Sequence, residues 1–306
     1  MISFHQLSDF WQRVWFKPAC PAPFCLFRIF FGAIVVWTAC EWLVNAGDLF
    51  GSQAMTSLST VRLHYPYRLS LFWWLFPSEP AVDCLLILFL LAAVALTLGY
   101  KTRISAFVVW LLLLSFDHRN PFILNCSDAF VRIAALLVFL GPAGKMYSLD
   151  SWFKAHREGT SATTELCEPW AQRLMQLQTA LIYAWSFFYK SGESWWNGTA
   201  LHYAMHVKCF AFLVSPSLFD NLWICRLLDA STLIIEFSLF TLVWVKGIRY
   251  WVLLAGLLLH SSLLVAMNIP TLQLIMMVSY INFIEPEKLQ SVMQTLAAKF
   301  SRAGKL

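Results

Sequence analysis

The chain has 306 residues, of which 59% are hydrophobic and 13% charged, and its formal net charge is +5. A soluble domain carries about 25% charged residues, so the composition excludes an ordinary soluble protein and predicts an all-α integral membrane protein. The basic residues are spread among loops, which argues against nucleic acid as a partner and for the lipid bilayer. Its eight cysteines contain no CxxC pair and no metal-ligand spacing, so we expect thiols packed in the core.

The chain begins with an amphipathic, aromatic segment at residues 3–16, which predicts an interfacial helix within residues 1–20. A membrane span needs about 20 apolar residues. By this criterion residues 21–285 form a polytopic bundle of about eight transmembrane helices, expected near 23–45, 80–98, 104–118, 121–142, 169–190, 222–245, 248–267 and 270–284. A cytoplasmic tail helix follows at 286–306, so we treat 1–306 as a single membrane domain. The first apolar run is too long for a signal peptide, and no cleaved leader is expected.

Positive charge collects on the cytoplasmic side of membrane proteins. If the N-terminus lies inside, the inner segments are the start of the chain, 99–103, 143–168, 246–249 and the tail. Each of them carries at least two basic residues, and together they hold most of the Lys and Arg. This bias predicts that both termini are cytoplasmic and that two long loops, 46–79 and 191–221, lie outside.

Ionisable side chains inside a membrane are costly and are therefore candidates for function. On this topology they gather in the outer half of the bilayer. His118 ends the third span, Asn125–Asp128 begin the fourth, Lys190 and Glu193 close the fifth, and His260 lies mid-depth in the seventh. We therefore predict a polar cavity that opens outward around Lys190.

Several of these residues also have a structural interpretation. The alternative for Lys190 is that its side chain only extends to the membrane interface, where the ammonium stays in water. Asp128 lies four residues before Arg132, and we expect the two to pair on one helix face. We expect Glu236 to pair with Arg226 or Arg132 inside the bundle.

His202 and His206 are spaced i, i+4 on one predicted helix face, as metal ligands can be. The sequence near them offers no evident third ligand. We therefore predict no metal site.

Five stretches occur in an order and spacing that covers nearly the whole chain: Phe27–Gly32, Gly99–Ser105, Asn125–Ser127, the K-x4-W-x2-G segment of Lys190, Trp195 and Gly198, and the run from His260 to Phe283 and Pro286. Together they resemble the vitamin K-dependent gamma-carboxylase family, in the membrane module known as the horizontally transferred transmembrane domain.

This resemblance implies that a reduced quinone is oxygenated by O2 at the outer side of the membrane. The strong base so formed takes the γ-proton of a glutamate, and CO2 adds to the carbanion. A lysine of the family deprotonates the hydroquinone, and this role falls on Lys190. An amine in an apolar surround gives up its proton more readily than one in water, so it can act as a general base.

The predicted topology and the resemblance together give the rest of the expected site. We expect the catalytic group to hold Lys190, Cys126, His260 and Asp128, and the quinol pocket to hold Trp195, Gly198, Asn125, Ser127, His118 and Glu193. The family has a histidine where this chain has Cys126, and that histidine supports the lysine.

We expect the large lumenal region of the animal carboxylase to be absent, as in short bacterial members of the family. We therefore expect a carboxylase-like enzyme of the bacterial inner membrane that takes a secreted peptide or protein as substrate. The alternative is a non-carboxylase maturation factor for a secreted peptide that works with partner membrane proteins. A transporter is disfavoured, because the sequence shows no repeats and no paired Gly/Pro-broken helices.

Overall fold

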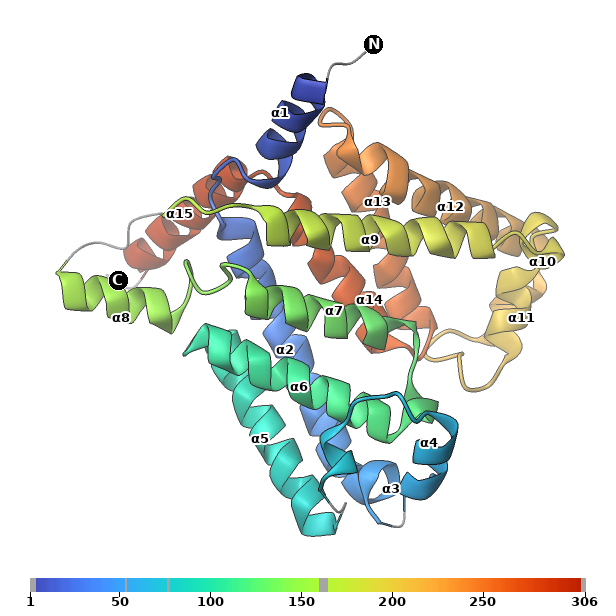
Figure 1. Cartoon of the computed structure of the whole chain (residues 1–306). Helices are drawn as coiled ribbons and strands as arrows, with labels where there is room; N and C mark the ends of the chain where they lie inside the picture. The colour runs from blue at the N-terminus through green and yellow to red at the C-terminus, as the bar shows by residue number, and fades with distance from the viewer. Residues whose placement is uncertain (1–3, 53, 76–77, 160–164, 304–306) are drawn as a thin grey trace. The chain divides into compact units, whose positions relative to one another are not determined.

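The structure is a computed structural model that describes residues 4–52, 54–75, 78–159 and 165–303. Over these residues the regular structure is helical, apart from isolated bridges between Ala19 and Cys167 and between Ala211 and Met267 (Figure 1). This confirms the predicted all-α class. Residues 1–3 of the predicted interfacial segment and 304–306 of the predicted tail lie outside the described ranges.

The chain divides into two compact units, which we describe separately. Unit 1 comprises residues 1–174 and 284–306, and unit 2 comprises residues 175–283. Whether residues 1–306 act as a single membrane domain stays a prediction.

Unit 1 contains the N-terminal helices and the C-terminal helix. In it α2 packs on α5, α5 on α6, and α6 on α7, while α15 contacts α2 (Figure 1). Its elements are α1 (Phe4–Trp15), α2 (Ala22–Val44), α3 (Ala46–Phe50), α4 (Leu58–His64), η1 (Leu71–Trp73), α5 (Glu79–Leu98), α6 (Thr102–Arg119), η2 (Pro121–Ile123), α7 (Cys126–Leu140), α8 (Leu149–Glu158) and α15 (Pro286–Ala303).

Unit 2 contains the remaining helices, and α9 begins just before its boundary. In it α12 packs on α13 and α13 on α14, while the short helices α10 and α11 contact α12. Its elements are α9 (Trp170–Tyr189), α10 (Glu193–Trp196), α11 (Ala200–His206), η3 (Pro216–Asp220), α12 (Leu222–Thr241), η4 (Leu242–Trp244), α13 (Arg249–Ala266), α14 (Pro270–Ser279) and η5 (Tyr280–Phe283).

Four of the described helices are long and apolar enough to cross a membrane: α2, α5, α12 continued by η4, and α13. The other four predicted spans fall on α6, α7, α9 and α14. With 10 residues, α14 is about 15 Å long, whereas the hydrocarbon core is about 30 Å thick. The chain is thus a polytopic membrane protein, and the count of about eight spans stays a prediction.

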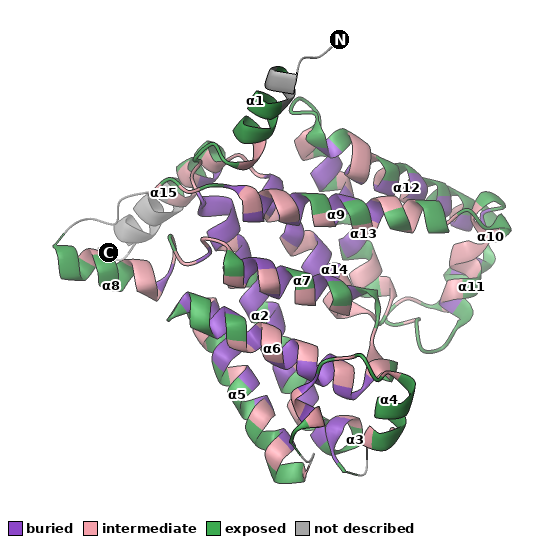
Figure 2. Ribbon diagram, in the orientation of Figure 1, coloured by how far each residue is buried: buried purple, intermediate pink, exposed green. Residues whose placement is uncertain are grey.

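The candidate spans bury one side and expose apolar residues on another. Figure 2 shows buried and exposed residues alternating along α5, whose Phe89 is buried while Leu91 is exposed. On α13, Leu253 is buried while Trp251 and Leu258 are exposed. Lipid tails are as apolar as leucine side chains, so these exposed faces suit contact with lipid.

Two of the family-like stretches meet in unit 1, where Arg28 of α2 reaches the C-terminal end of α5. Arg28 is fully buried, and it donates from Nη1 to the carbonyl of Leu96 (3.2 Å) and from Nη2 to that of Tyr147 (2.5 Å). Gly99 has φ of 71°, and a Cβ there would lie 1.8 Å from Arg28 Nη1. Only glycine fits this position, and the guanidinium bonds the Leu96 carbonyl at the C-terminal, negative end of α5.

We expect Arg28→Ala to destabilise the protein strongly, because it removes one hydrogen bond from each of the Leu96 and Tyr147 carbonyls and opens a cavity in the core. The loss should be roughly 3 kcal/mol or more, which lowers the midpoint of thermal unfolding in detergent by roughly 5 °C or more. The control is Arg103→Ala, since Arg103 is exposed on α6. Equal midpoints for the two variants would contradict a supporting role for Arg28.

Candidate functional site

Lys190 directly follows α9 in unit 2 and is held by a carboxylate. Its Nζ donates to Oε1 (2.7 Å) and Oε2 (2.8 Å) of Glu236 on α12, and also to the Ser186 hydroxyl. The side chains of Lys190 and Glu236 are 18% and 9% exposed. A snorkelling lysine keeps its charge in water, whereas this ammonium is largely buried with a counter-ion.

The ion pair that the structure gives Glu236 is therefore with Lys190, and the predicted pairing with Arg226 or Arg132 is wrong. Arg226 lies ten residues earlier on the same helix, about 15 Å along its axis. Arg132 instead pairs with Asp117 (2.9 Å) within unit 1.

A second polar group lies on the same face of α9. Tyr183, Ser186 and Lys190 follow one another at i, i+3 and i+7, a spacing that places side chains on one helix face. The Tyr183 hydroxyl lies 2.6 Å from His260 Nε2 and 2.6 Å from the Tyr280 hydroxyl, and His260 Nδ1 lies 2.5 Å from Gln273 Oε1.

The hydrogen bonds of this group have a defined direction. The Gln273 oxygen can only accept, so His260 Nδ1 donates to it, and the neutral imidazole accepts from Tyr183 at Nε2. Tyr183 then accepts from Tyr280. All four side chains are buried. His260, predicted as a catalytic residue, therefore joins α13 to α9 and α14 through hydrogen bonds.

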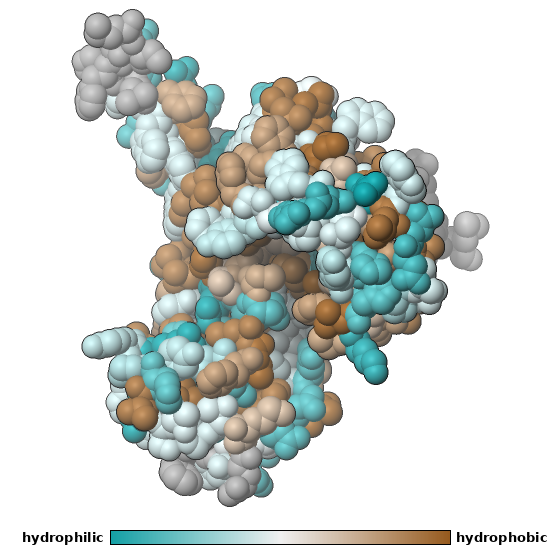
Figure 3. All heavy atoms as spheres, turned by 90° about the vertical axis from the view of Figure 1, so that its right-hand side faces the viewer, coloured by the Kyte–Doolittle hydropathy of each residue, from teal (hydrophilic) through white to brown (hydrophobic). Residues whose placement is uncertain are grey.

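Trp195 on α10 lies between Lys190 and a groove in unit 2. Lys190 Nζ is 5.2 Å from the centroid of the Trp195 ring, within reach of a cation–π contact. The groove measures about 920 Å³ and is lined by Trp195, Trp196, Gly198 and Arg226, with Leu233 and Phe237 of α12. Figure 3 views the chain from the side of α10 and α11, and shows hydrophilic side chains beside hydrophobic ones there.

Gly198, the glycine of the K-x4-W-x2-G segment, allows a close approach of α12. It has φ of +69°, and a Cβ would lie 2.1 Å from Cγ and 2.6 Å from Cα of Arg226. Arg226 in turn donates from Nε to the carbonyl of Asn197 (3.2 Å). Glu193 begins α10 and accepts from the Asn197 amide (3.2 Å), so this contact stays within α10 and its C-cap.

The predicted site residues of unit 1 form a helix cap. The Asn125 side chain accepts from the backbone N–H of Ser127 (2.8 Å), and the Asn125 backbone N–H donates to Asp128 Oδ2 (2.6 Å). The expected pair of Asp128 with Arg132 is wrong, because Asp128 satisfies the N–H at the start of α7. Arg132 instead neutralises Asp117, whose side chain is 1% exposed.

The other two candidates of unit 1 lie at the helix ends near this cap. Cys126 is the first residue of α7 and is exposed. His118, in the last turn of α6, donates from Nδ1 to the carbonyl of Leu69 (2.6 Å).

Within each unit, then, the structure brings a subset of the predicted residues together. Asn125, Ser127 and Asp128 meet at the start of α7 in unit 1. Lys190 and Trp195 meet in unit 2, where Gly198 shares the groove with Trp195 and His260 contacts the helix that leads to Lys190.

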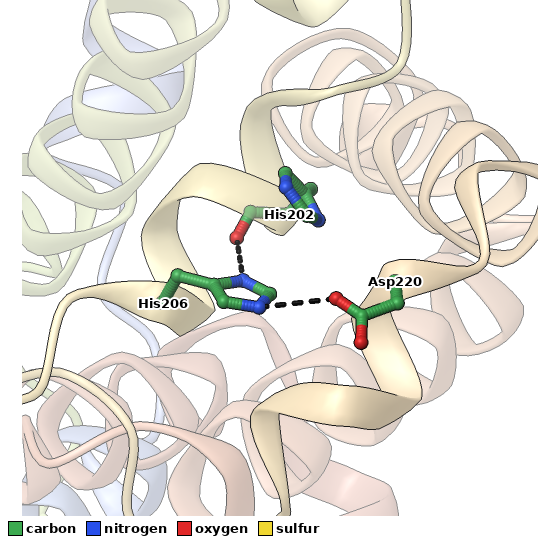
Figure 4. Close-up of side chains that lie close together, drawn as sticks. All are labelled: His202, His206 and Asp220. Carbon is green, nitrogen blue, oxygen red and sulfur yellow. Dashed lines mark hydrogen bonds and ion pairs between the residues drawn. The ribbon is translucent and has the colours of Figure 1, made fainter.

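Four residues of this site were not predicted from the sequence: Tyr183, Ser186, Gln273 and Tyr280. The spacing of Tyr183 and Ser186 ahead of Lys190 was the available signal, since it places three polar side chains on one face of an apolar helix. The sequence near His202 and His206 offered no evident third ligand, whereas the fold brings Asp220 beside them (Figure 4). The predicted absence of a metal site stays a prediction.

Comparison with known proteins gives one family match. A family model described as HTTM domain matches residues 16–287, a range that includes all five of the motif stretches. The comparisons with curated proteins and with solved structures gave no match.

We expect Gly198→Ala to destabilise the loop after α9, because the new Cβ collides with Arg226 and the backbone keeps a strained φ. The cost should be about 1–3 kcal/mol. It is measured as a lower midpoint of thermal unfolding, followed by tryptophan fluorescence. Gly192→Ala is the matched control, since Gly192 has φ of −69° and open space around its Cβ position. If both variants unfold alike, the close approach of Arg226 does not matter for stability.

Proposed function

Since this chain belongs to the HTTM domain family, which contains proteins related to the vitamin K-dependent carboxylase, we propose that it is a quinol-dependent membrane enzyme. The proposed reaction is oxygenation of a reduced quinone by O2, coupled to addition of CO2 to the γ-carbon of a glutamate in a secreted peptide. The proposed site lies around Lys190, at the outer face of a bacterial inner membrane, with both termini in the cytoplasm.

The observation that carries the proposal is the position of Lys190 between Glu236 and the ring of Trp195. Trp195 also lines the groove of about 920 Å³. Small-molecule sites are typically apolar clefts of about 300–1,000 Å³ with a few polar groups. The tryptophans offer flat faces for a quinone ring, Arg226 offers hydrogen-bond donors, and the apolar residues of α12 suit a hydrocarbon tail.

The ion pair changes the expected proton transfer. In an ammonium–carboxylate pair, the proton already sits on the amine and the basic group is the carboxylate. We therefore assign the base to the pair. The O–H bond of the quinol breaks and its proton goes to Glu236, or to Lys190 after Lys190 has passed a proton to Glu236. The positive charge that remains near the oxygen stabilises the quinolate anion.

A second candidate function rests on Cys126. It occupies the position of the family histidine, and the polar residues around it are engaged in the cap of α7. A chain adapted in this way would serve as a non-carboxylase maturation factor that binds a secreted peptide together with partner membrane proteins.

The test is O2-dependent consumption of a reduced naphthoquinone by the purified protein in detergent. We expect Lys190→Ala to lower the rate by roughly 10²–10⁴-fold. Lys208→Ala changes an exposed lysine in the segment between α11 and η3, and this variant should keep the wild-type rate.

Unpaired Glu236 would itself destabilise Lys190→Ala. The double variant Lys190→Ala/Glu236→Gln carries no unpaired charge and should be equally inactive but better folded. If both variants still consume the quinol, the pair of Lys190 and Glu236 is not the base of the reaction. A wild-type protein that neither binds nor consumes the quinol would overturn the enzyme proposal in favour of the maturation factor.

A further inference from the structure

Three side chains with metal-binding atoms converge beside α11. His202 and His206 come from one face of this helix, and Asp220 is the last residue of η3 (Figure 4). One ligand atom from each residue lies within 4.8 Å of the other two. His206 Nε2 is 3.1 Å from Asp220 Oδ1, and the two imidazole centroids are 4.4 Å apart.

Backbone carbonyls orient both imidazoles. Nδ1 of His202 donates to the carbonyl of Phe219 (2.8 Å), and Nδ1 of His206 donates to the carbonyl of His202 (2.8 Å). A neutral imidazole that donates at Nδ1 keeps its lone pair at Nε2. Metal-ligating histidines characteristically have this arrangement, in which a carbonyl fixes the tautomer and the ring.

A buried cluster and hydrogen bonds to α12 hold together the two segments that carry these side chains. Met205 and Phe219 are buried in a small cluster with Cys225, whose Sγ donates to the Phe219 carbonyl (3.2 Å). Asp229 of α12 accepts from the backbone N–H of Ala200 at the start of α11 (3.1 Å). The backbone of the cluster is therefore positioned without a metal.

We propose that His202, His206 and Asp220 bind a divalent transition-metal ion, with Zn²⁺ as the ion to test. Two imidazole nitrogens and one carboxylate oxygen suit Zn²⁺ and its neighbours in the first transition row. They suit Ca²⁺ and Mg²⁺ less well, because these ions prefer oxygen ligands throughout.

The geometry requires a small closure. Ligands at about 2.1 Å from a tetrahedral Zn²⁺ lie roughly 3.4 Å apart, so separations of up to 4.8 Å must close by at most about 1.4 Å. Side-chain rotation supplies this, since the side chains of His206 and Asp220 are 41% and 63% exposed. Three protein ligands leave a fourth position for water or for a group of a bound molecule.

Such an ion would link α11 to η3 and so cross-link the loop that runs from Lys190 to α12. The site goes beyond the proposed quinol chemistry and does not depend on it. The simpler explanation is an isolated ion pair between His206 and Asp220, which needs no contribution from His202.

The experiment is a calorimetric titration of Zn²⁺ into the full-length protein in detergent, after removal of metal with EDTA. We expect one Zn²⁺ per chain, with micromolar or tighter affinity. His202→Ala and Asp220→Asn should each weaken binding at least 10-fold, since even the outer partners of metal ligands contribute 10–100-fold. His64→Ala removes an exposed histidine of unit 1 and should leave binding unchanged.

Two further readouts separate metal binding from folding. Co²⁺ should give the visible absorption of a low-symmetry site, and it should be lost in His202→Ala. In EDTA the unfolding midpoint of Asp220→Asn should match that of the wild type, whereas Zn²⁺ should raise only the wild-type midpoint.

Absence of Zn²⁺ binding, or full affinity in His202→Ala, would overturn the proposal. Because the readout is metal binding, its failure leaves the result of the quinol assay unaffected, and failure of the quinol assay leaves the metal result standing.

Discussion

The ion pair between Lys190 and Glu236 sets the arrangement of unit 2. A single charge buried among apolar helices is costly, and a partner of opposite charge lowers that cost. The pair ties the C-terminal end of α9 to the C-terminal half of α12. Tyr183 and Ser186 lie on the same face of α9 as Lys190. The hydrogen bonds of Tyr183 to α13 and η5 are therefore made on that side of the helix. The polar residues are thereby collected among the helices, while exposed residues such as Leu227 and Trp251 remain apolar.

The stretches that resemble the carboxylase family contain two kinds of residue: those that hold helices together and those that suit a reaction. Arg28 and Gly99 fix the junction of α2 with α5, and Gly198 makes room for Arg226. These residues explain a shared scaffold and require no shared substrate. Lys190 and Trp195 are different, because their side chains meet beside a groove. Family membership therefore accounts for the helices, and the case for quinol chemistry depends on that second pair.

Hydropathy was enough to predict the all-α class and the apolar helix that leads to Lys190. It was not enough to choose the partner of Glu236, since the sequence offered several cations and helix packing made the choice. The i, i+4 spacing of Asp128 and Arg132 predicted an ion pair that the structure does not contain. The Asp128 carboxylate instead accepts from the backbone N–H of Asn125 at the start of α7. Asp220 follows His206 by 14 residues, so only the fold brings it beside His202 and His206.

The position of Arg28 has a consequence for how the protein is made. Arg28 lies in the first candidate span, and its carbonyl partners, Leu96 and Tyr147, are 68 and 119 residues further along. When α2 leaves the ribosome, neither partner has been synthesised. A lone arginine in an isolated helix opposes entry into the bilayer, so α2 needs either the insertion machinery or water around its guanidinium until α5 and the segment beyond α7 arrive. Stable integration of the first helix is therefore a late event in the biogenesis of this chain.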